Sequence, residues 1–143
     1  MNFKLSPALF IAAAVAIAAP AQAANPDHVQ RLLETRSCAG CDLAGADLTE
    51  AHLLGADLRD ANLEGANLTN ANLEGADLTG ANLQGANLSD AFASNASLNL
   101  ANLQDANLQD ANMSNAQTLG ANMNGIDITG AIVQGSGISI GND

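Results

Sequence analysis

The chain has 143 residues and a formal net charge of −11, with 15 acidic residues against 4 basic ones and only 3 aromatic residues. Its length is typical of one domain, and the acidic balance without a basic patch argues against direct nucleic-acid binding. Abundant Ala, Asn and Gly could indicate disorder. Leucines nevertheless recur at a strict spacing, which favours a folded chain.

Residues 1–23 have the features of a secretory signal peptide. Lys4 supplies a positive amino-terminal region, residues 9–19 are apolar, and Ala21-Gln22-Ala23 offers small residues at a cleavage site. The apolar run is short for a membrane span, so we expect cleavage after Ala23, with an uncleaved anchor as the alternative. The mature chain would keep 3 basic and 15 acidic residues, a net charge of −12. We expect no membrane association after cleavage.

A single helix is predicted, over residues 25–36. Asn25 or Asp27 can cap its start, and Pro26 suits a first turn. Apolar residues at i, i+3 and i+4 form one face of this helix: Val29, Leu32 and Leu33. A short amphipathic helix directly before a repeat array is expected to cover the open apolar end of that array. Residues 24–40 are therefore assigned to a helical cap.

A five-residue unit, Ala-(Asp/Asn)-Leu-x-x, recurs from Cys41 to Gly135, a stretch of 95 residues that holds nineteen units. This period fits neither an α-helix, which turns by about 100° per residue, nor a flat strand, whose side chains alternate with a period of about two. The chain must therefore bend once per repeat, with Ala and Leu inward. Gly, Asn and Asp supply the corners. The pattern predicts a solenoid of stacked coils.

The repeat resembles that of the pentapeptide-repeat proteins, over residues 41–140 with a short tail at 141–143. The resemblance implies an all-β solenoid, a right-handed four-sided β-helix with four repeats per coil. The inward residues would then stack in four columns: Leu43, Leu63, Leu83, Leu103 and Met123; Leu48, Leu68, Leu88, Leu108 and Ile128; Leu53, Leu73, Ala93, Met113 and Val133; Leu58, Leu78, Leu98, Thr118 and Ile138.

Two places interrupt these columns. Ala93 replaces a Leu, and Phe92 either folds over the corner to cover the gap or is exposed as a contact. Thr118 also replaces a Leu, and a local one-residue shift could turn Leu119 inward instead. If no shift occurs, outward Leu100, Leu119 and Ile140 of the later coils form one strip, and Phe92 lies near an adjacent corner. We predict these four residues as a partner surface.

Cys38 and Cys41 directly precede the regular repeats. A redox site of the thioredoxin type uses this spacing but needs an αβ scaffold, and a metal site needs more ligands than two cysteines. An exported protein with two cysteines most simply forms a disulfide, which would join the cap to the first coil. The stretch from Asn25 to Leu43 also resembles the leader-to-repeat junction of exported cyanobacterial members of the family. That resemblance implies a periplasm or a thylakoid lumen.

No catalytic constellation, cofactor motif or metal motif is recognisable, and His28 and His52 have no nucleophile placed beside them. Acidic and amide residues share one predicted face: Asp47, Glu50, Asn67, Asn87, Asp90, Asn107, Asp110 and Asp127. This face is either a solvated surface that resists edge-to-edge aggregation or a weak cation site.

The sequence therefore predicts a non-enzymatic, exported structural or interaction protein that presents flat faces to an unidentified protein partner. Self-association through the C-terminal coil is one form that this could take. The alternatives are an acidic surface that binds cations or a basic ligand, a DNA-mimicking topoisomerase binder of the kind found in the family, and a redox protein that uses the two cysteines.

Overall fold

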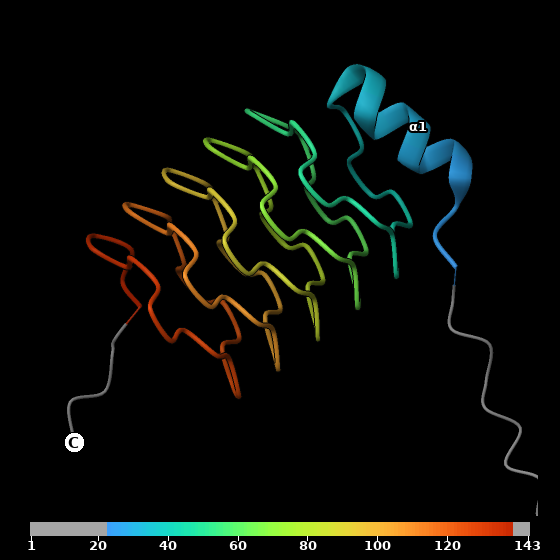
Figure 1. Cartoon of the computed structure of the whole chain (residues 1–143). Coiled ribbons are helices and arrows are strands. Elements are labelled where there is room, and N and C mark those ends of the chain that lie inside the picture. Colours follow the sequence, from blue (N-terminus) through green and yellow to red (C-terminus); the bar gives the residue numbers. More distant parts are fainter. Residues whose placement is uncertain (1–22, 139–143) are drawn as a thin grey trace, which may run out of the picture.

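The structure, a computed structural model, describes residues 23–138 and consists of one helix at one end of a stack of coils (Figure 1). The predicted signal peptide, apart from Ala23, and Ile140 lie outside the described residues. Within residues 23–138, no helix is long and apolar enough to cross a membrane. The helix and the last described coil lie at opposite ends of the stack.

Helix α1 spans Pro26–Thr35 and has its caps where the sequence placed its ends. The Asn25 side chain accepts a 3.0 Å hydrogen bond from the Asp27 N–H, and Arg36 adopts a left-handed conformation at φ 55° that ends the helix. Leu32 is fully buried. The prediction that Leu33 shares its packing face is wrong, because Leu33 is half-exposed. Successive helical residues differ in direction by about 100°, so Leu33 turns away from the coil end, where Leu32 is buried and Val29 packs against the core.

Each coil contains twenty residues. Single parallel β-bridges join residues twenty apart along the whole array, from Ser37↔Asp57 to Asn112↔Ile132. Twenty residues correspond to four repeats of five, as the resemblance implies. Each repeat contributes one bridged residue, so residues 23–138 contain bridges rather than longer strands. The fold is a β-helical solenoid, and its handedness stays a prediction.

The four repeats of a coil make four sides. Side one contains residues 41–45, 61–65, 81–85, 101–105 and 121–125, and side two contains 46–50, 66–70, 86–90, 106–110 and 126–130. Side three contains 51–55, 71–75, 91–95, 111–115 and 131–135, and side four contains 36–40, 56–60, 76–80, 96–100, 116–120 and 136–138.

The same backbone hydrogen bonds recur on every side. The Leu63 N–H donates to the carbonyl of Asn82 in the next coil at 2.7 Å, and the Asn82 N–H donates back to the carbonyl of Ala61 at 2.9 Å. The Ala and Leu side chains between these bonds point inward and are buried from Leu43 to Leu108. The predicted columns are therefore confirmed over this range.

Both interruptions keep the phase of the array. Ala93 occupies the Leu position and is buried, while Phe92 stays outward. Thr118 occupies the next such position, and its Oγ1 donates a 2.7 Å hydrogen bond to the Ser136 carbonyl. Leu119 is 81% exposed, so the local shift that would bury it does not occur.

The first coil begins one repeat ahead of the predicted boundary at residue 41, because bridging starts at Ser37. Cys38 therefore occupies an inward Leu position, and it forms a disulfide with Cys41. The disulfide links two sides of the first coil. The prediction that it joins the cap to the first coil is therefore wrong. The cap is held by hydrogen bonds instead. The Asp42 N–H donates to His28 Nδ1 at 3.0 Å, and the Asn25 N–H donates to the Asp42 carbonyl at 3.3 Å.

Candidate interaction surface

Three of the four predicted partner-surface residues lie within the described chain, and all three are exposed. Phe92 is on side three and is 53% exposed; Leu100 and Leu119 are on side four and are 68% and 81% exposed. The sequence reading missed Ile132, which is 54% exposed and lies on side three two coils beyond Phe92. An apolar residue at a position held by Asn or Asp in most repeats was the signal that could have found it.

Leu100 has an unusual backbone for its residue type. It adopts φ 60° at the last position of its repeat, a corner that Gly, Asp or Asn usually fills in this chain. A left-handed conformation costs an L-residue roughly 1–2 kcal/mol, and bulky residues rarely adopt it. The Leu100 side chain lies over Gly120 in the next coil, and its Cδ2 is 2.9 Å from where a Cβ on Gly120 would lie. A strained, exposed Leu at such a corner is typical of a functional position.

A shallow groove of about 540 Å³ borders Leu119 on side four. Its walls include Asn99, Gln117, Thr118 and Ser136. The Asn99 side chain fixes this region, because its Oδ1 accepts a 2.9 Å hydrogen bond from the Leu119 N–H and its Nδ2 donates to Gln117 Oε1 at 3.2 Å. The groove therefore offers an apolar residue beside amide and hydroxyl groups of fixed geometry.

Charge is absent from the part of the solenoid that carries these apolar residues. Sides three and four contain no charged residue from residue 91 to residue 138. The acidic residues of this half lie on side two or at the ends of sides one and two: Asp105, Asp110 and Asp127. The later coils therefore present an uncharged surface with exposed apolar side chains next to an acidic one. We call the first of these, defined by Phe92, Leu100, Leu119 and Ile132, the apolar surface.

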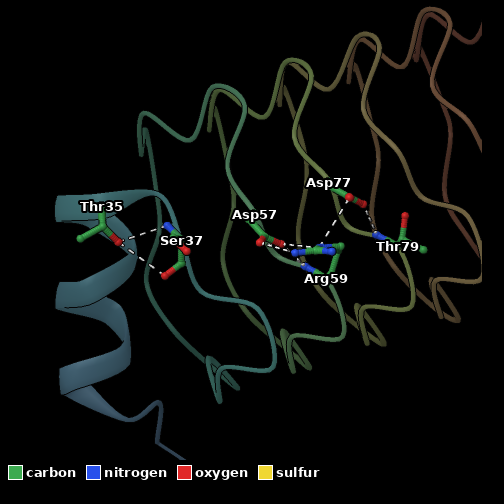
Figure 2. A network of polar contacts seen from close by, with 6 residues as sticks. All are labelled: Thr35, Ser37, Asp57, Arg59, Asp77 and Thr79. Carbon is green, nitrogen blue, oxygen red and sulfur yellow. Dashed lines mark hydrogen bonds and ion pairs between the residues drawn. The ribbon is translucent and has the colours of Figure 1, made fainter.

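The early coils of side four differ, because they carry an ion-pair network (Figure 2). Arg59 donates to both carboxylate oxygens of Asp57, at 2.8 Å from Nε and 2.7 Å from Nη2, and its Nε lies 3.8 Å from Asp77. These bonds lower the pKa of Asp57 and raise that of Arg59. The pair is exposed, so solvent screens it and it contributes little to stability.

Many polar side chains on sides one and two hydrogen-bond to one another. On side one, each Asn side chain donates from Nδ2 to the residue twenty before it, in an unbroken ladder at 3.0–3.3 Å: Asn122 to Asn102, Asn102 to Asn82, Asn82 to Asn62, and Asn62 to Asp42. On side two, Asn67 and Asn87 donate to Thr hydroxyls of the preceding coil. Hydrogen bonds from Thr49 and Thr129 lower the pKa values of Asp47 and Asp127.

The cysteine and histidine positions do not form a reactive site. Cys38 and Cys41 are almost fully buried beneath α1, and the Cys38 sulfur lies 3.3 Å from the His28 carbonyl oxygen. His28 packs against the first coil, whereas His52 is exposed on side three. Within residues 23–138, no three His, Cys, Asp or Glu side chains gather as a metal site would require.

Comparison with known families agrees with this geometry. The family described as pentapeptide repeats matches residues 37–75, 76–115 and 96–135, with eight copies of the repeat. The chain belongs to the pentapeptide repeat family. The match begins at residue 37, where bridging begins, and it extends through the apolar surface to residue 135. No curated protein matches the chain significantly.

Several solved pentapeptide repeat structures are similar to the chain. A pentapeptide repeat protein from the thylakoid lumen of Arabidopsis thaliana is 35% identical over 71% of each chain, with a TM-score of 0.68. One from the cyanobacterium Cyanothece is 29% identical over 74% of this chain and 92% of its own, with a TM-score of 0.37. QnrB1, a plasmid-mediated fluoroquinolone resistance protein, is 24% identical over 59% of each chain, with a TM-score of 0.24. Of these three structures, the Arabidopsis protein is the one with a TM-score above 0.5.

Proposed function

We propose that this pentapeptide repeat protein is a non-enzymatic, exported interaction module that binds a protein partner through its apolar surface. The array is a rigid stack, since every coil is bonded to the next by repeated backbone hydrogen bonds. A rigid stack with regular sides suits the positioning of a partner better than chemistry on a substrate. We also propose that the coils wind right-handedly around four flat sides, as the family resemblance implies.

The distribution of exposed apolar residues carries this proposal. Leu100, Leu119 and Phe92 are all more than half exposed in a part of the solenoid without charge. Exposed apolar residues that cluster on an otherwise polar protein mark binding sites. The left-handed Leu100 adds weight, because Gly or Asn would fit that corner without strain.

We propose a thylakoid lumen or a bacterial periplasm as the compartment. The similar Arabidopsis protein comes from a thylakoid lumen, and a disulfide in a small domain suits an oxidising compartment. The predicted signal peptide leads to the same expectation. Mass spectrometry of exported protein should find Ala24 as the first residue, and a retained Met1 would contradict export with cleavage.

The test is partner capture by cross-linking in the native compartment. We expect the double variant Phe92→Ser and Leu119→Ser to lose the partner and to stay folded, because both side chains are more than half exposed. Leu54→Ser is the matched control, since Leu54 is 48% exposed and lies in the first coil on side three. Circular dichroism should show all variants folded. Equal capture by the double variant and the wild type would overturn the proposal.

The alternative functions receive less support from the structure. The buried disulfide opposes a redox role, which needs an accessible sulfur. The later acidic residues concentrate on side two and its corners, whereas a DNA mimic would need charge along more of the surface. Cation binding by side two stays an alternative prediction, and a calorimetric calcium titration would support it by showing saturable heat.

A further inference from the structure

The C-terminal end of the core is less covered than its N-terminal end. Leu32 of α1 closes the first coil and is fully buried. At the other end, most inward residues of the last coil are only partly buried, among them Ile126, Ile128 and Ala131, although Val133 is buried. An apolar core end beside unpaired backbone usually needs a cover.

The backbone edge of this last coil is regular on side three. The backbone of Ile132 bonds to the preceding coil: its N–H donates to the Ala111 carbonyl, and its carbonyl accepts from the Met113 N–H. Among the described residues, the N–H of Val133 and the carbonyl of Ala131 have no hydrogen-bond partner. They flank Ile132, whose own N–H and carbonyl bond to the preceding coil. This edge therefore presents one donor and one acceptor, separated by a single residue.

Such an edge is complementary to itself. We propose that two copies of this chain pair through side three of their last coils, antiparallel, about a two-fold axis at Ile132. The Val133 N–H of one copy then donates to the Ala131 carbonyl of the other, and the reverse bond forms by symmetry. The two Ile132 residues lie opposite each other in the close, non-hydrogen-bonded type of pair, with Cα atoms about 4.5 Å apart. Their exposed side chains then bury each other.

The charge of the residues that would face each other favours pairing of two copies through side three over pairing through side two. Side two has the same edge, formed by the Ile128 N–H and the Ile126 carbonyl. Its two-fold axis would fall on Asp127, and it would place two carboxylates directly opposite each other, which destabilises a strand pair. The axis at Ile132 avoids this contact and matches an apolar residue with its own copy.

The inference rests on the proposed function only in treating the protein as an interaction module. It shares with the apolar surface only Ile132, which the partner-capture variant Phe92→Ser and Leu119→Ser leaves unchanged. A failed partner capture therefore leaves the pairing of two copies standing, and a monomeric protein leaves partner capture standing.

The first test is sedimentation of the exported full-length protein over a concentration series. We expect a monomer–dimer equilibrium, with Ile132→Lys raising the dimer Kd by about tenfold or more. Phe92→Lys is the matched control, because Phe92 occupies the same column at 53% exposure against 54% for Ile132. A monomer at every concentration, or equal effects of the two variants, would overturn the proposal. Coverage of the edge by the chain's own C-terminal residues would give that monomer.

Cysteine cross-linking tests the axis and does not depend on how Ile132→Lys folds. The two native cysteines are joined in a buried disulfide, so an added cysteine is the reactive one. Ile132→Cys should form a covalent dimer under mild oxidation, since Cα atoms at this pair distance suit a disulfide. Phe92→Cys, in the same column but two coils from the edge, should not. Cross-linking of Phe92→Cys in preference to Ile132→Cys would refute the axis.

Discussion

The stacked core predicts that the same kind of truncation costs more in the middle of the array than at its C-terminal end. Leu68 lies in a central coil and is fully buried. Leu68→Ala should lower the free energy of unfolding by about 3 kcal/mol, since it removes transfer energy and leaves a cavity between two rigid coils. Met123 is only partly buried in the last coil, so Met123→Ala should cost about half as much.

Far-UV circular dichroism during urea unfolding measures this difference, because the chain has no Trp or Tyr to report by fluorescence. The m-values should stay close to that of the wild type if unfolding remains cooperative. Leu88→Ala serves as an internal replicate, since Leu88 occupies the same column one coil later and is equally buried. Equal losses for the central and terminal variants would contradict a core that ends at the last coil. A central loss below about 1 kcal/mol would contradict the inward assignment itself.

Three further predictions concern the cap, the disulfide and acid. His28→Ala should leave the Asp42 N–H without its partner, cost about 1 kcal/mol, and speed hydrogen exchange at that amide before the distal coils, whereas unchanged exchange would contradict the docking role. Replacing both cysteines with Ala should lower the melting temperature modestly, since the closed loop is short, and damage should stay local to the first coil by protease mapping. The pKa values of Asp47, Asp57 and Asp127 lie below their ordinary 3.8. The stability contributed by these carboxylates should therefore be fully present above about pH 4 and be lost as pH falls through their lowered values. Urea midpoints from pH 7 to pH 2 measure this loss, and Asp57→Asn should remove part of it.

The phase of a five-residue repeat determines most of this fold before any coordinates are known. A period that fits neither helix nor strand forces one corner per repeat, and the leucines then fix the inward columns. The helix was predictable because capping residues flank an amphipathic stretch, and α1 has Asn25 and Arg36 as its caps. The disulfide pairing followed from having two cysteines in a chain with an export signal.

The errors arose where the pattern is weak or where tertiary contact decides. Residues 36–40 lack both Ala and Leu at the inward positions, so the first repeat was assigned to the helical cap and the disulfide to the junction between the cap and the first coil. Only its phase, with Gly40 at a corner, could have revealed it. The contact of His28 with the first coil was not predicted, because no sequence signal shows that a helix places its imidazole against the Asp42 N–H. Leu32 and Leu33 are both apolar, but they point in different directions, and of the two only Leu32 is buried against the first coil.

The outward residues give the least predictable and most informative part of the molecule. At inward positions the fold dictates Ala and Leu, so their identities report on packing alone. An outward corner in a left-handed conformation favours Gly or Asn, yet residue 100 is Leu. The core gains little from this choice, since the side chain is 68% exposed and lies over Gly120 at the corner of the next coil. If packing alone governed this site, Leu100→Asn should raise stability by relieving the backbone. We expect that stabilisation together with weaker partner capture, the combination that separates a binding residue from a structural one.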